Sequence, residues 1–161
     1  MNVRAVLFAV LAALAACSPM AADAGQKSAA AASARHPESG LQVVPLTIAT
    51  AIGRHTFRVE VARSGEEQAR GLMFRTAMGA NEGMIFPMEP ARQASFWMKN
   101  TVMPLDLVFI GPDKRIESIA ANAVPYSLSP ISSKGNVSAV LELNGGRAAQ
   151  LGLAPGDVAS W

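Results

Sequence analysis

Residues 105–120 read Leu-Asp-Leu-Val-Phe-Ile-Gly-Pro-Asp-Lys-Arg-Ile-Glu-Ser-Ile-Ala, and this stretch indicates the class of fold. Two runs rich in β-forming residues, 105–110 and 115–120, flank the turn residues 111–114. In such a turn proline presets φ, and the aspartate accepts a hydrogen bond from the backbone two residues further on. The stretch therefore predicts two antiparallel strands that pair as a hairpin.

Short runs of the same kind recur between residues 43 and 161, separated by turn-forming residues. Phe57, Val59 and Val61, for example, alternate with charged side chains, as expected for a half-buried strand. The predicted strands are 43–51, 56–61, 83–86, 95–99, 105–110, 115–120, 137–143 and 158–161.

Two short helices are predicted among these strands. Ser64 and Glu67 have the spacing of a capping box, which predicts a helix that starts after Ser64 and ends near residues 70–72. A second helix is expected over 147–151, before Gly152. Many short strands with few helical residues predict an antiparallel β-sandwich or a small barrel with one or two short helices.

The 161-residue chain has the length of one domain rather than two, and its composition excludes several classes of protein. A single cysteine, Cys17, excludes a disulfide framework and a cysteine cluster for zinc or iron–sulfur. Residues 43–161 hold 11 basic and 10 acidic side chains, a net charge of +1, and contain no basic run. This balance does not favour nucleic-acid binding.

Residues 1–16 have the pattern of a secretory signal peptide, with Arg4 followed by an uncharged apolar run. The run is shorter than the roughly 20 residues that a membrane-spanning helix needs. Residues 14–17, Leu-Ala-Ala-Cys, resemble the lipobox of bacterial lipoproteins, in which the cysteine becomes the lipid-modified first residue. We predict an exported, periplasmic protein anchored to the outer membrane through Cys17. Cleavage after Ala24 is the alternative, and it would release a soluble protein.

Residues 17–42 are poor in large apolar side chains and rich in alanine, serine and glycine. Such a segment buries too little surface to offset the entropy lost on ordering, so we expect a flexible tether, with an alanine-rich helix over 28–34 as the alternative. The folded domain is expected over residues 43–161.

Four ordered blocks of sequence within this domain resemble the DUF192 (UPF0127) family. They are Arg-Gly-Leu-Met-Phe-Arg at 70–75, Gly-Met-Ile-Phe at 83–86, Phe-Trp-Met-Lys-Asn-Thr at 96–101 with Met-Pro-Leu-Asp at 103–106, and Val-Leu-Glu-Leu at 140–143 with glycines at 145 and 146. The resemblance implies a compact, mainly β domain of the sandwich or jelly-roll-like barrel type, often exported. It implies no activity, because none is established for the family.

The third block gathers an indole, an ammonium, an amide and a carboxylate within eleven residues. Trp97 beside Lys99 is the kind of pair that stacks on a sugar or planar ligand and bonds its polar edge. We therefore expect a small polar or glycan-like ligand, or an envelope partner protein, to bind there. The predicted binding residues are Arg70, Arg75, Trp97, Lys99, Asn100 and Asp106.

Two carboxyl groups within apolar strands, Asp106 and Glu142, leave two other interpretations open. If they converge, they could act as the acid and base of a cell-envelope hydrolase or lyase. If each is paired with a cation, the protein is a purely structural lipoprotein.

The sequence favours no metal and no other cofactor. Its six methionines between residues 73 and 103 are irregularly spaced, and His36 and His55 form no zinc-binding pair. It also lacks a nucleophile elbow and a glycine-rich phosphate loop.

Overall fold

The computed structural model describes residues 34–161, and the predicted hairpin is present in it as β5 (Leu105–Ile110) and β6 (Ile116–Ala123). The expected turn chemistry is also present. The backbone N–H of Gly111 donates to the Arg115 carbonyl at 2.7 Å, and that of Arg115 donates to Asp113 Oδ1 at 3.1 Å. The proline–aspartate turn therefore joins the two strands as the sequence predicted.

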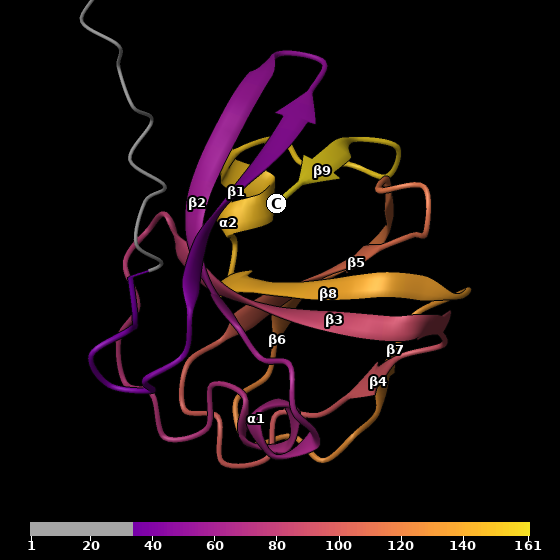
Figure 1. Cartoon of the computed structure of the whole chain (residues 1–161). Coiled ribbons are helices and arrows are strands. Elements are labelled where there is room, and N and C mark those ends of the chain that lie inside the picture. Colours follow the sequence, from indigo (N-terminus) through magenta and orange to yellow (C-terminus); the bar gives the residue numbers. More distant parts are fainter. Residues whose placement is uncertain (1–33) are drawn as a thin grey trace, which may run out of the picture. The chain divides into compact units, whose positions relative to one another are not determined.

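Seven strands form one mixed sheet in the order β6-β5-β8-β3-β2-β1-β9 (Figure 1). The further strands in it are β1 (Val43–Thr50), β2 (Gly53–Val61), β3 (Glu82–Arg92), β8 (Val137–Asn144) and β9 (Val158–Ser160). A second sheet has two short strands, β4 (Ser95–Phe96) and β7 (Ile131–Ser132). The mainly β class is confirmed.

One pair of neighbouring strands departs from the expected antiparallel pattern, because β2 and β3 run parallel. A parallel pair needs a long crossover, and residues 62–81 provide it. This crossover contains α1 (Gly65–Arg70), whose capping box joins Ser64 and Glu67 as predicted. Backbone N–H groups of Ser64 and Arg63 lower the pKa of Glu67.

The large sheet curls but does not close into a barrel. Its two edge strands approach at a single bridge between Arg115 and Val158, where the backbone N–H of Ala159 donates to the Lys114 carbonyl at 2.8 Å. The second helix, α2 (Arg147–Gln150), follows β8. Neither helix of residues 34–161 is long and apolar enough for a membrane span.

The two faces of the sheet bury separate cores. The first core lies inside the curl and contains Phe57, Ile85 and Leu141 together with Ala148 of α2. The second core lies on the other face, where the loops and β4 cover it, and it includes Phe86. Its members also include four methionines: Met84, Met88, Met98 and Met103. Thioether side chains suit such an irregular space.

Residues 34–42, which the sequence placed in the tether, lie against the domain. The backbone N–H of Val43 donates to the Ala34 carbonyl at 2.7 Å, and Arg35 forms a bridge with Gln42. The buried guanidinium of Arg75 holds this segment, because its Nε lies 3.0 Å from Glu38 Oε2. The folded unit therefore starts earlier than residue 43. The predicted signal peptide, Cys17 and the remaining tether lie outside the described residues.

Gly83 allows β3 to approach β8 closely at the centre of the sheet. A Cβ atom added at Gly83 would lie 2.5 Å from the Glu142 carbonyl oxygen and 3.1 Å from Leu143 Cδ2. We predict that Gly83→Ala lowers the free energy of unfolding by about 1–3 kcal/mol, the usual cost of overpacking. Urea unfolding followed by circular dichroism measures it.

Gly53→Ala is the matched control, because a Cβ there meets nothing within 4 Å. Equal unfolding midpoints for the two variants would contradict the close approach of β3 and β8.

Candidate functional site

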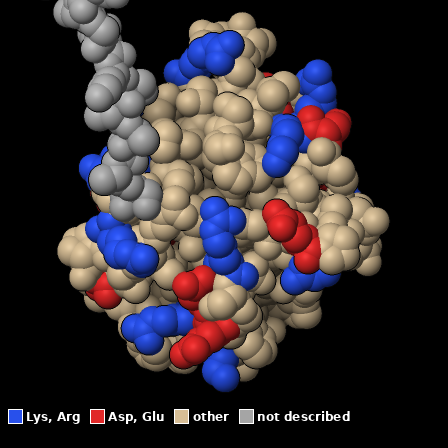
Figure 2. Space-filling view, viewed as in Figure 1, with Lys and Arg blue, Asp and Glu red and all other residues tan. Residues whose placement is uncertain are grey.

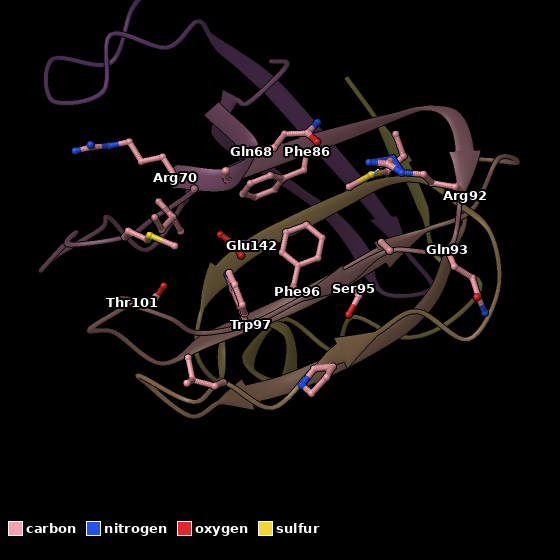
Figure 3. Close-up of a pocket in the computed structure, with 18 residues that line it drawn as sticks. Gln68, Arg70, Phe86, Arg92, Gln93, Ser95, Phe96, Trp97, Thr101 and Glu142 are labelled. Carbon is pink, nitrogen blue, oxygen red and sulfur yellow. Dashed lines mark hydrogen bonds between the residues drawn. The ribbon is translucent and has the colours of Figure 1, made fainter. Parts of the chain in front are cut away.

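A cavity of about 520 Å³ opens on the face of the sheet that carries the second core (Figure 3). Helix α1, strands β3, β4 and β8, and the loops after α1 and β4 contribute its walls. Its aromatic lining residues are Phe86, Phe96 and Trp97, and its charged ones are Arg70, Arg92 and Glu142. Its other polar side chains include Gln68, Gln93, Ser95 and Thr101.

The aromatic wall combines two packed rings with one exposed indole. The rings of Phe86 and Phe96 have centroids 5.0 Å apart and are nearly perpendicular, at 86°. Trp97 is 52% exposed, and the Lys99 Nζ atom lies 5.4 Å from the centroid of its ring. Strand β4 ends at Phe96 rather than at Lys99, so Trp97 lies in the loop that follows it. The cavity thus has a rigid aromatic interior and an accessible indole.

Glu142 brings a buried carboxyl group to this cavity. It lies in β8, opposite Met84 of β3 and Leu107 of β5, and is only 5% exposed. Its Oε2 atom is buried and has no hydrogen-bond partner among the described residues. Burial raises the pKa of Glu142 from 4.5 to about 8. At neutral pH the group is therefore mainly a neutral carboxylic acid.

Asp106 is also fully buried, but its oxygens are satisfied by the backbone. Oδ1 accepts hydrogen bonds from the N–H groups of Asn122 and Gly146, at 2.8 and 2.9 Å, and Oδ2 accepts one from Ala148 at 2.8 Å. The carboxylate thus fixes the start of α2 to β5. This structural position differs from the ligand contact that the sequence predicted.

Asp106 and Glu142 do not converge. In the ladder between β5 and β8, Asp106 pairs with Leu143 while Glu142 pairs with Leu107. Because successive side chains in a strand point to opposite faces, the two carboxyl groups lie on opposite faces of the sheet. The paired-carboxylate geometry of the hydrolase interpretation is therefore absent.

The other predicted binding residues divide between the cavity and the scaffold. Arg70 and Trp97 line the cavity, whereas Arg75 forms its ion pair with Glu60, at 2.8 Å between Nη1 and Oε1. The Lys99 ammonium group lies near the indole ring of Trp97, and Lys99 does not line the cavity. Asn100 lies beside the site in a left-handed turn with φ 55°, and its Nδ2 is 3.8 Å from Met73 Sδ.

Sequence reasoning missed the aromatic pair and underrated Glu142. Phe86 and Phe96 read only as strand residues, because their contact joins β3 to β4 across the second core. The sequence signal for Glu142 is a carboxyl group between two leucines. Asp106 also lies between two leucines, so this pattern does not distinguish the two residues. Within residues 34–161, no three His, Cys, Asp or Glu side chains are arranged to hold a metal ion.

The model of the DUF192 family, described as an uncharacterized ACR family, matches residues 47–161. The chain belongs to the DUF192 family. No curated protein matches the chain, so no DUF192 activity can be carried over from one.

Two solved structures are similar to this DUF192 chain. A protein of unknown function from Novosphingobium aromaticivorans DSM 12444 is 57% identical, with a TM-score of 0.80, over 82% of this chain and 94% of that one. A putative transcription regulator from Sinorhizobium meliloti 1021 is 40% identical, with a TM-score of 0.73, over 74% of this chain and 94% of that one.

The raised pKa of Glu142 predicts a pH dependence of stability. In the unfolded chain the carboxyl ionises near pH 4.5, whereas in the folded chain it keeps its proton to about pH 8. The folded state thus binds more protons between these values, and its stability falls as the pH rises through that window. We expect Glu142→Gln to remove this fall and to gain stability over the wild type, by a few kcal/mol at pH 8.

Chemical denaturation from pH 4.5 to 9 measures the free energy of unfolding of both proteins. The contributions of the other carboxyl groups to its pH dependence cancel when the two curves are subtracted. Parallel curves for the two proteins would show that Glu142 ionises normally.

Proposed function

We propose that this DUF192 domain is a ligand-binding module of the cell envelope and that its ligand is a small organic molecule bound in the cavity. The observation that carries the proposal is the carboxyl group of Glu142, a residue that lines the cavity and whose buried Oε2 atom has no hydrogen-bond partner among the described residues. A buried polar atom without a partner costs about 1–3 kcal/mol. A ligand that supplies the missing hydrogen bond recovers this free energy.

The size and lining of the cavity support a small molecule as the ligand. Ligand sites commonly enclose about 300–1,000 Å³ and combine apolar or aromatic walls with a few polar groups, and the 520 Å³ cavity fits this description. The accessible face of Trp97 suits a planar or sugar-like body, while Glu142 suits a polar group. Both features favour a small polar or glycan-like ligand over a large apolar one.

The same carboxyl group supports a second candidate function, general acid–base catalysis. An acid whose pKa lies near the working pH is effective in proton transfer, and burial gives Glu142 such a pKa. Binding remains our first proposal, because no second carboxyl group among the described lining residues accompanies Glu142.

A nucleic-acid ligand has less support than a small molecule. The name of the Sinorhizobium meliloti relative suggests transcriptional regulation for that protein. In this chain, residues 43–161 carry a net charge of +1, and Figure 2 shows basic and acidic side chains interspersed over the face in view. A binding surface for the phosphate backbone calls for a basic patch or stripe.

We predict that a ligand of the cavity shifts the indole N–H resonance of Trp97 and leaves that of Trp161 in place. The two tryptophans are the only ones in the chain, and Trp161 does not line the cavity but stacks with Lys114. A screen of a chemically diverse fragment library by ¹⁵N–¹H correlation spectroscopy makes the comparison.

Phe96→Leu removes one aromatic ring from the cavity wall and is expected to weaken the binding of every fragment that shifts the Trp97 resonance. Ile52→Ala is the control, because Ile52 is exposed and does not line the cavity. A library in which no fragment shifts Trp97 selectively would overturn the proposed function.

We also propose that a lipid on Cys17 holds the domain at the outer membrane. The lipobox-like sequence at residues 14–17 supports this location. Growth with an alkynyl palmitate analogue is expected to label the wild type and not Cys17→Ala. An unlabelled wild type, or label that survives the substitution, would instead favour cleavage after Ala24 and a soluble protein.

A further inference from the structure

We propose that the ligand is an organic cation whose ammonium group binds between Glu142 and the aromatic wall of the cavity. This inference rests on the proposed function, because it names the chemical class of the molecule that occupies the cavity.

Within residues 34–161, no cation forms a salt bridge with Glu142. Among the described residues that line the cavity, the only other charged side chains are Arg70 of α1 and Arg92 of β3. Neither forms a salt bridge with Glu142, and Arg92 Nη1 contacts Met88 Sδ at 2.8 Å. Figure 3 shows Arg70 directed away from Glu142. Both arginines are exposed, so water and salt screen their repulsion of a cation more than they screen the attraction of the buried carboxyl group.

The rings beside Glu142 add a second attraction for a cation. Phe86, Phe96 and Trp97 surround the carboxyl group in the cavity (Figure 3). The faces of aromatic rings carry negative charge density and attract ammonium groups, most strongly in tryptophan. Trp97 already attracts one ammonium group, that of Lys99. A neutral hydroxyl group would satisfy Glu142 but would gain little from these ring faces.

An exposed apolar residue lines the cavity and two more lie beside lining residues in the sequence, which indicates that the cation carries an apolar body. Leu128 lines the cavity and is 66% exposed, Phe74 follows the lining residue Met73 and is 60% exposed, and Tyr126 precedes Leu128 in the same loop and is 62% exposed. We call these three residues the rim. Their loops are tied together, because the N–H of Phe74 donates to the Asn100 carbonyl at 2.8 Å and that of Tyr126 donates to the Thr101 carbonyl at 3.1 Å.

Two rim residues, Phe74 and Tyr126, have positive φ values of 65° and 61°, and the neighbouring Asn100 has a φ of 55°. Such values are uncommon for residues other than glycine and asparagine. They are often found at ligand sites, although Lys114 and Asn122 also adopt them elsewhere in this domain. The rim, together with Glu142 and the aromatic rings inside the cavity, fits an amphipathic amine. This amine is either a free small molecule or a lysine side chain flanked by apolar residues in a polypeptide.

The test compares pairs of probes that share an apolar body and differ in whether they carry a positive charge. Isothermal titration calorimetry at pH 7 with the folded domain measures the affinity of each probe. One pair is benzylamine and benzyl alcohol. The other pair is a phenylalanine-lysine-phenylalanine peptide with both termini blocked and the same peptide acetylated on its lysine. We expect each cation to bind about tenfold or more tightly than its neutral partner. The arm with the larger ratio identifies the source of the ammonium group.

Glu142→Gln is expected to abolish the preference for the cation, whereas Glu66→Gln, which removes an exposed carboxylate of α1, is expected to keep it. The cation also displaces the carboxyl proton, so the binding enthalpy of the wild type depends on the ionisation enthalpy of the buffer. This dependence disappears in Glu142→Gln.

The outcomes separate this inference from the proposed function. Neutral probes that bind as tightly as the cations, or a preference that survives in Glu142→Gln, overturn the cation and leave the binding cavity in place. Failure of both cations to bind also overturns it, while the fragment screen decides independently whether the cavity binds any small molecule. The wild-type comparison needs no variant, so it stands even if Glu142→Gln folds poorly.

Discussion

Strand β8 lies between β3 and β5, and its hydrogen bonds to both decide which side chains enter each core. The ladder directs Leu141 and Leu143 into the first core and leaves Glu142 on the opposite face. Glu142 therefore lies on the face that carries the second core and lines the cavity, with 5% of its surface exposed. The cavity, the raised pKa of its carboxyl group and the proposed ligand chemistry all depend on this position.

Three buried acidic groups of the domain differ in how their charge is satisfied. Asp106 accepts three backbone hydrogen bonds, and Glu60 pairs with Arg75, so both stabilise the scaffold. Within residues 34–161, Glu142 has neither kind of partner for its buried oxygen. A solitary buried carboxyl group opposes folding, and the ligand that we propose would compensate for this cost.

The sequence predicted the fold better than the site, because local patterns carry the fold. Alternating residues near Phe57, the capping box at Ser64 and the turn before Lys114 each act within a few residues, and each is present. The parallel pairing of β2 with β3 and the ion pair between Arg75 and Glu38 join distant segments, which no local pattern indicates. Asp106 and Glu142 also lie in similar local sequences. Only the register of their strands places them on opposite faces of the sheet.

The most direct test of this account is the titration of the Glu142 side-chain carboxyl carbon by ¹³C NMR, with the resonance assigned by its loss in Glu142→Gln. We expect a midpoint near pH 8, because the group is buried and its Oε2 atom has no partner among the described residues. A midpoint near 4.5 would show that water or a nearby cation already satisfies the carboxylate, and it would contradict the central role given to Glu142.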